Sequence, residues 1–104
     1  MKIYDKLVRD NIPEIIENAG KKFDIHYAKA EELVSLLEAK LQEEALEFSQ
    51  DKNLEELADL MEVIFGLSSA LGYSEEDLLK KREEKKLERG GFKEGIVLER
   101  VYED

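Results

Sequence analysis

The sequence predicts a mainly helical, single-domain protein in which the central helices lie antiparallel. Apolar residues recur at three- and four-residue spacing through the middle of the chain, as they do on the buried face of an amphipathic helix. Short turns interrupt these stretches, and helices joined by short turns pack antiparallel as a bundle. The chain has 104 residues, 42% hydrophobic and 40% charged. This length and composition fit one domain, residues 1–104, with a heavily charged surface.

The first expected element is a short helix that follows the opening segment of the chain. Asp10 or Asn11 can cap it, and Pro13 is tolerated in its first turn. Gly20 is expected to end it. Three long helices are then expected, over residues 30–50, 53–71 and 74–89.

Two segments outside these helices alternate apolar and polar residues, as half-buried strands do. They are residues 22–29, with Phe23, Ile25 and Tyr27, and residues 96–102. A strand needs a partner. We therefore expect a small two-stranded pairing of these segments, which would bring both chain ends close to the helices.

Charge and composition exclude several classes of function. A net charge of −10 opposes binding to a nucleic-acid polymer. The chain has no cysteine, which rules out disulfides and thiolate metal sites. No apolar run is long enough for a membrane span or resembles a signal peptide. We expect a cytoplasmic protein without a membrane partner.

Glu44 lies on the face of the first long helix that should be buried. It comes three residues after Leu41 and four before Phe48, in the same stripe as Leu37. Glu47 projects beside it, one turn further on. A buried carboxylate costs several kcal/mol unless it is paired or binds a metal, so these two acids need an explanation.

The second long helix repeats this pattern near its start, where Glu56 and Asp59 are one turn apart. Because the two helices are expected to be antiparallel, Glu44 and Glu47 should lie opposite this second pair. Oxygen ligands without histidine or cysteine suit Mg²⁺, with Mn²⁺ as a substitute. We expect these four acids to hold the metal. The alternatives are a solvated acidic face or salt bridges to lysines such as Lys40.

Bound cations would let a nucleotide's phosphate chain dock at this site and would activate a water. Three further nearby acids are candidates for the general base, namely Glu43, Glu55 and Glu62. Residues that can bind phosphate lie in two segments, Lys6 and Arg9 near the start and Arg82, Lys85, Lys86 and Arg89 in the third long helix. Helix capping, the helix dipole and surface ion pairs are the alternative explanation for these cations.

The second long helix is apolar around most of its circumference. Between Leu60 and Leu71 its only charged residue is Glu62. A helix of this kind packs on more than one side, within a bundle or across a subunit interface. We therefore expect a homodimer or a homotetramer.

Glu43-Glu44-x-x-Glu47 followed by Glu56-x-x-Asp59 resembles the signature of the MazG-like all-alpha nucleotide pyrophosphohydrolase superfamily. Residues 6–16 and the sequence Arg89-Gly-Gly-Phe92 are similar to its phosphoribosyl-ATP pyrophosphohydrolase-like branch, so the resemblance covers nearly the whole chain.

This resemblance implies an enzyme that hydrolyses the bond between the α and β phosphates, giving a nucleoside monophosphate and pyrophosphate. It also implies that Glu44, Glu47, Glu56 and Asp59 are metal ligands, and it leaves the cationic residues less certain. The substrate is left open among phosphoribosyl-ATP, noncanonical triphosphates removed in nucleotide housekeeping, and ordinary deoxynucleotides.

Two other functions are compatible with parts of the pattern. One is a non-enzymatic acidic helical module that oligomerises and binds a protein. The other is a di-iron carboxylate bundle, which normally requires Glu-x-x-His pairs that this sequence lacks.

Overall fold

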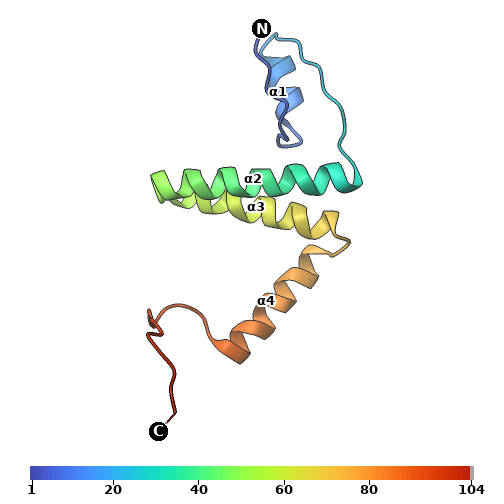
Figure 1. Cartoon of the computed structure of the whole chain (residues 1–104). Coiled ribbons are helices and arrows are strands. Elements are labelled where there is room, and N and C mark those ends of the chain that lie inside the picture. The colour runs from blue at the N-terminus through green and yellow to red at the C-terminus, as the bar shows by residue number, and fades with distance from the viewer. Residues whose placement is uncertain (104) are drawn as a thin grey trace.

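The computed structural model describes residues 1–103 and has four helices in that range. They are α1 (Ile12–Asn18), α2 (Ala30–Asp51), α3 (Leu54–Ala70) and α4 (Glu75–Arg89). Figure 1 shows α2 and α3 lying antiparallel at the centre. The mainly helical architecture predicted from the sequence is confirmed.

The α2–α3 hairpin is held by its turn and by a close helix contact. Lys52 adopts a left-handed conformation with φ of 47°, which reverses the chain within a very short connection. Leu37 and Val63 are the hydrophobic side chains buried between the two helices within residues 1–103. Gly66 allows a close approach, because a Cβ atom there would lie 3.1 Å from Leu37 Cδ2.

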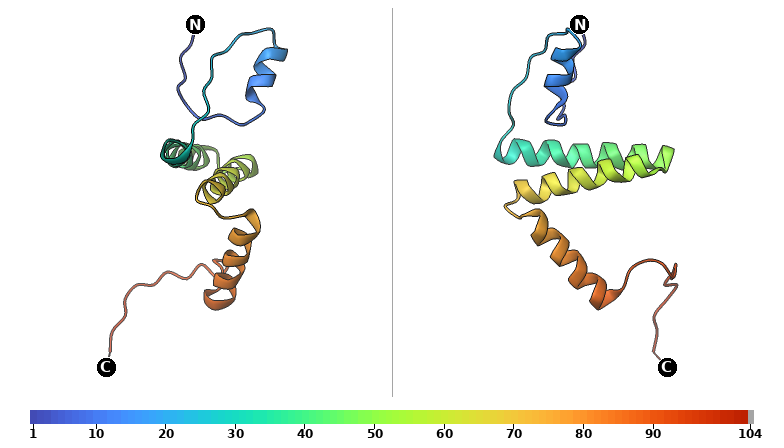
Figure 2. Two further views of the ribbon diagram at one scale, coloured as in Figure 1. Left: turned by 90° about the vertical axis from the view of Figure 1, so that its right-hand side faces the viewer. Right: turned by 180° about the vertical axis from the view of Figure 1, so that it is seen from behind.

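Of the two outer helices, α4 packs against α3 over a small area, whereas α1 packs against no other helix in residues 1–103. Figure 2 shows α1 on the α2 side of the hairpin, separated from α2, and α4 on the opposite side, beyond α3. Pro13 lies in the first turn of α1, as predicted. Ser74 caps α4, and Asp77 completes a capping box with it. α4 meets α3 only near the turn, where the Ser68 hydroxyl lies 3.4 Å from the Ser74 carbonyl oxygen.

The predicted pairing of two strands is wrong. Residues 22–29 and 96–102 have no regular secondary structure, and no strand occurs anywhere in residues 1–103. Figure 1 shows the first segment on the α2 side of the molecule and the second beyond α4. The segments therefore have no partner, and the side chains of Phe23, Ile25 and Tyr27 are exposed.

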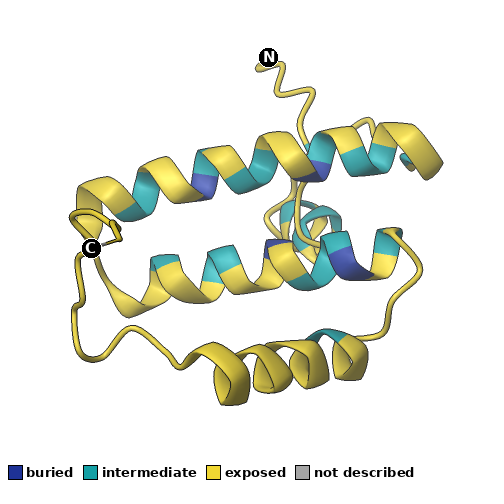
Figure 3. Cartoon of the chain, turned by 60° about the horizontal axis from the view of Figure 1, so that its bottom comes forward, coloured by how far each residue is buried: buried dark blue, intermediate teal, exposed yellow. Residues whose placement is uncertain are grey.

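The chain is extended for its length. Its radius of gyration is 18.5 Å, whereas a compact domain of this size has about 13 Å. Figure 3 shows the buried positions confined to α2 and α3, with α4 almost wholly exposed. Within residues 1–103, no helix is both long and apolar enough to cross a membrane.

Candidate metal centre

Three carboxylates from the central hairpin come together near its turn. Glu44 lies on α2, and Glu56 and Asp59 lie on α3. One oxygen from each lies within 4.8 Å of the others. The antiparallel hairpin brings the end of α2 opposite the start of α3, as expected from the sequence. The side chain of Asn53 fixes the first turn of α3, because it accepts a hydrogen bond from the Glu56 backbone N–H at 2.9 Å.

Glu44 is the most deeply buried of these acids, with 7% of the residue exposed. Its Oε1 lies 3.7 Å from Lys40 Nζ, but its Oε2 finds no hydrogen-bond partner among the described residues. Burial raises the pKa of Glu44, and the neighbouring Glu47 carboxylate raises it further. A buried carboxylate with an unpartnered oxygen is destabilising unless a cation reaches it.

Glu56 has the same unusual feature. Its Oε2 is buried and has no hydrogen-bond partner within residues 1–103. Desolvation raises the pKa of Glu56, and the negative charges of Glu47, Asp59 and Asp51 add to the effect. Glu47 is half-buried and influences both Glu44 and Glu56. It therefore lies beside the three-carboxylate group, although it does not belong to it.

The opening segment supplies cations to the edge of this cluster. Arg9 Nη2 donates to Asp59 Oδ1 at 2.8 Å. Lys6 Nζ lies 3.6 Å from Glu43 Oε1, and Lys40 Nζ lies 3.3 Å from Glu43 Oε2. Desolvation pushes the pKa of Glu43 upward, but the two ammonium groups together outweigh it and lower that pKa.

The basic residues of α4 lie elsewhere. Figure 1 shows α4 leaving the hairpin at the end of α3 that is opposite the acidic cluster. Four phosphate-binding candidates from the sequence lie in α4, namely Arg82, Lys85, Lys86 and Arg89. None of them forms an ion pair with any residue in the described part of the chain. The structure thus groups Lys6 and Arg9 with the acids but does not group the α4 cations with them.

Comparison of the chain with family models, curated proteins and solved structures found no match.

The donor set fits a hard divalent cation. It offers only oxygens, and two of these, on Glu44 and Glu56, are buried without partners. Glu44, Glu56 and Asp59 could hold Mg²⁺ directly, with Glu47 close enough to two of them to serve as a fourth ligand.

Two contributors to the site were not identified from the sequence. Asn53 orients the turn that carries Glu56, and Asp51 adds negative charge near Glu56. The cap could have been recognised, because asparagine directly before a helix is a strong capping residue. No spacing rule would have singled out Asp51, which ends α2 as an exposed residue.

Proposed function

We propose that this protein is a Mg²⁺-dependent nucleotide pyrophosphohydrolase. It would cleave the bond between the α and β phosphates of a nucleoside triphosphate or a related nucleotide such as phosphoribosyl-ATP. The observation that carries this proposal is the pair of buried, unpartnered oxygens on Glu44 and Glu56, within reach of Asp59. The motif resemblance to MazG-like pyrophosphohydrolases supports the same reaction.

In this proposal each group has a distinct task. Glu44, Glu47, Glu56 and Asp59 hold the metal, which supplies positive charge to the phosphoryl oxygens and acidifies a water. Arg9 and Lys6 lie at the edge of the same cluster. Their side chains are about half exposed, so each can exchange its carboxylate partner for the phosphates of a bound nucleotide.

The structure also bears on the choice of general base. Glu43 is held by Lys6 and Lys40, and its lowered pKa makes it a weak proton acceptor. Glu55 and Glu62 are exposed on α3. Glu47 has no lysine partner in the described residues, so its carboxylate remains available to the metal as the fourth ligand.

The decisive test is pyrophosphate release from canonical and modified nucleoside triphosphates and phosphoribosyl-ATP, with Mg²⁺ and with chelator. We expect turnover only with the metal, and the ranking of substrates will identify the nucleotide class. Glu56→Gln should abolish turnover, whereas the matched control Glu55→Gln, on the exposed side of the same turn, should retain it. Equal turnover in both variants would refute the site.

A non-enzymatic acidic helical module is the second candidate, and the large exposed apolar surface of the chain favours it. Such a module has no need of a metal. A thermal melt with and without Mg²⁺ separates the two functions, because a ligand that binds only the folded protein raises its stability. The absence of any shift, together with no turnover, would favour the binding module.

We further propose that the enzyme works in the cytoplasm, where its nucleotide substrates are found, and that it is a homodimer or a homotetramer. The assembly is needed because one chain has a very small core.

A further inference from the structure

The opening segment, residues 1–21, has little contact with the rest of the molecule. Its helix α1 has seven residues and packs against no other helix in the described part of the chain. The backbone hydrogen bonds around α1 are all made within the segment itself. A helix this short is unstable in water on its own. The order of α1 therefore depends on the contacts that hold the segment against the α2–α3 hairpin.

Two ion pairs connect the opening segment to the hairpin. Lys6 Nζ lies 3.6 Å from Glu43 Oε1 on α2, and Arg9 Nη2 donates to Asp59 Oδ1 on α3 at 2.8 Å. In the described part of the chain, no other ion pair or side-chain hydrogen bond joins the segment to later residues. Exposed ion pairs contribute little stability, so this attachment is easily broken.

One of the two ion pairs uses a candidate metal ligand. Asp59 belongs to the three-carboxylate group with Glu44 and Glu56, and it is also the acceptor of Arg9. Glu43, which pairs with Lys6, lies outside that group. Arg9 therefore places a full positive charge beside the position that a metal would occupy.

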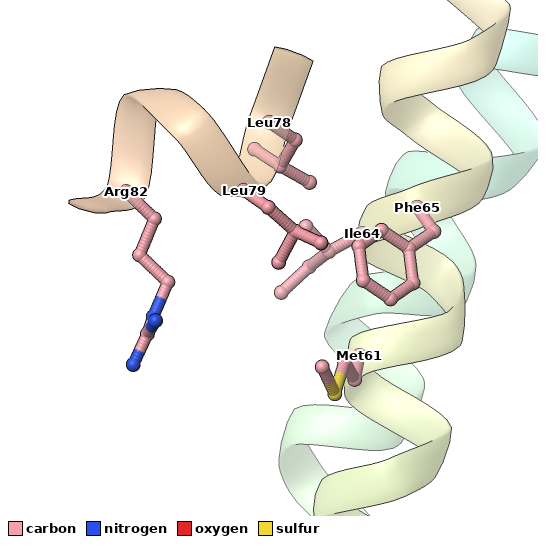
Figure 4. A pocket seen from close by; sticks show the side chains of 6 residues that line it. All are labelled: Met61, Ile64, Phe65, Leu78, Leu79 and Arg82. Atoms are coloured by element: carbon pink, nitrogen blue, oxygen red, sulfur yellow. The ribbon is translucent and has the colours of Figure 1, made fainter. Parts of the chain in front are cut away.

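The other three arginines of the chain do not reach the acids in this structure. Arg82 lines an apolar groove between α3 and α4, and Figure 4 shows its side chain at the outer edge of the groove, away from α3. Arg89 is in the last turn of α4, and Arg100 is in the segment that follows. None of the three forms an ion pair within residues 1–103. The guanidinium at the acidic cluster is that of Arg9.

A divalent cation at the three carboxylates and the guanidinium of Arg9 repel each other. Both are attracted to Asp59, but over a few ångströms the repulsion between a double and a single positive charge exceeds the weak attraction of an exposed ion pair. Arg9 therefore leaves Asp59 when a cation occupies the cluster. By reciprocity, Arg9 in its observed position lowers the affinity of the cluster for a free cation by the same factor.

A phosphate chain reverses the sign of this coupling. Its oxygens are negatively charged, so a divalent cation and a guanidinium can bind the same chain, and arginine can do so through two parallel hydrogen bonds. The side chain of Arg9 is 56% exposed, which leaves it room to turn from Asp59 to a phosphate beside it. That contact draws the opening segment back toward the hairpin.

We propose that the opening segment is a strap whose position depends on what the acidic cluster binds. Arg9 holds the strap on Asp59 in the absence of metal, a divalent cation alone releases it, and a metal-bound phosphate chain holds it again. The site then takes up its metal preferentially together with the phosphate chain, because a free cation has to displace Arg9. This inference rests on the metal site of the proposed function and does not require hydrolysis.

The first measurement is the affinity of the full chain for Mg²⁺ by titration calorimetry. Arg9→Gln should bind Mg²⁺ about tenfold more tightly than the unaltered protein, because a positive charge beside the cation is removed. The matched control is Arg100→Gln, which removes the same charge from a residue without an ion pair in residues 1–103. Its affinity should change less than about twofold, since salt screens distant charges.

The same variants test the part of the proposal that concerns phosphate. With Mg²⁺ at saturation, Arg9→Gln should bind inorganic pyrophosphate about tenfold more weakly than the unaltered protein, because a charge-assisted contact is lost. Arg100→Gln should bind it as the unaltered protein does. The substitution at Arg9 thus changes the affinities for free metal and for phosphate in opposite directions, which a general disturbance of the fold would not do.

A second measurement uses the unaltered protein and follows the strap directly by hydrogen exchange. The α1 amides should exchange at least about threefold faster when Mg²⁺ is added, because the released helix frays. Inorganic pyrophosphate added together with Mg²⁺ should restore the slower exchange. The amides of α2 and α3 around Leu37 and Val63, which are buried in the hairpin, are the internal control and should not exchange faster.

Four results would overturn the proposal. Equal Mg²⁺ affinity in the unaltered protein and Arg9→Gln would leave the metal site standing but show that the strap does not compete for it. Weaker Mg²⁺ binding by Arg9→Gln would mean that Arg9 supports the ligands. Exchange of α1 that Mg²⁺ leaves unchanged would show that other contacts hold the strap. No Mg²⁺ binding in any variant would refute the metal site of the proposed function and the strap together.

Discussion

The carboxylate of Glu44 combines burial with an oxygen that has no hydrogen-bond partner among residues 1–103. Most buried polar atoms in proteins are hydrogen-bonded, and one that is not lowers the stability of the folded protein. The same is true of Glu56. The acids at the turn therefore affect stability and the proposed metal binding in opposite directions.

Replacing Glu44 with glutamine should stabilise the protein in the absence of metal. Glutamine removes the buried charge and can donate a hydrogen bond to the Glu47 carboxylate, a gain of about 1 kcal/mol. For a domain of this size, this corresponds to a rise of roughly 4–8 °C in Tm. Thermal melts check this, with Glu38→Gln on the exposed face of α2 as the control. A lower Tm for Glu44→Gln than for the control would contradict it.

The same substitution should also abolish stabilisation by Mg²⁺. If the metal is present at 100 times its Kd, the unaltered protein gains about 2.7 kcal/mol. Glu44→Gln should show no such shift, whereas Glu38→Gln should show it in full. A shift of equal size in Glu44→Gln would remove Glu44 from the ligand set.

The pKa shifts predict how stability depends on pH without metal. The pKa values of Glu44 and Glu56 are raised above the ordinary 4.5, so the folded protein binds these protons more tightly than the unfolded chain does. Their stabilising contribution is present below pH 4.5 and is lost as the pH rises through the folded pKa values. Acidification from neutrality should therefore raise Tm.

Below pH 4.5 a different pair of acids reverses this trend. The pKa values of Glu43 and Asp77 are lowered, so their contribution is lost as the pH falls through the folded values. Melts from about pH 7 down to about pH 3 should pass through a maximum. The increase in Tm between neutral pH and this maximum should be smaller in Glu44→Gln. An unchanged profile of Tm against pH in that variant would argue against the raised pKa of Glu44.

At the scale of secondary-structure elements, the α2–α3 contact depends on Gly66. A Cβ atom there would lie 3.1 Å from Leu37 Cδ2, so a larger side chain must displace the Leu37 side chain or push the helices apart. Gly66→Leu should lower the free energy of unfolding by about 1–3 kcal/mol. Chemical denaturation measures this, and Ser69→Leu at an exposed position of α3 is the control. Equal stability in the two variants would show that the contact is loose.

The opening segment and α4 offer competing sets of phosphate-binding cations. Arg9 contacts Asp59 at 2.8 Å, whereas Arg89 lies in the last turn of α4, away from Glu44, Glu56 and Asp59. Arg9→Ala should raise KM about tenfold through the loss of a charge-assisted contact, and Arg89→Ala should have a smaller effect. Steady-state kinetics will decide. A larger effect for Arg89→Ala would indicate that α4 of another protomer supplies cations to the site.

The helices and the acidic cluster could be predicted because both follow from local spacing. The pattern of residues 30–50 and 53–71, with a short turn between them, is enough to place Glu44 opposite Glu56 and Asp59. The alternation of apolar and polar residues in 22–29 does not show that a partner strand exists, and the predicted pairing with residues 96–102 is wrong. The approach of Lys6 and Arg9 to the hairpin depends on how the opening segment folds back, which no periodicity encodes.

At the scale of the whole molecule, the extended shape and the excess exposed surface predict that folding depends on protein concentration. For a chain that folds only as a dimer, a tenfold increase in concentration adds about 1.4 kcal/mol to its stability. Tm should rise by several degrees over this range. Melts of the unaltered protein at several concentrations check this, and a constant Tm would show that the isolated chain folds alone.

The hairpin described above has a consequence for the order in which the protein folds. All the candidate ligands lie between Glu44 and Asp59, on either side of the tight turn at Lys52. Closing so short a loop costs little entropy, and contacts between residues close in sequence form early. The acids would therefore be among the first side chains to approach one another as the chain folds. A cation bound there would favour the folded hairpin, because it would offset the repulsion among these acids.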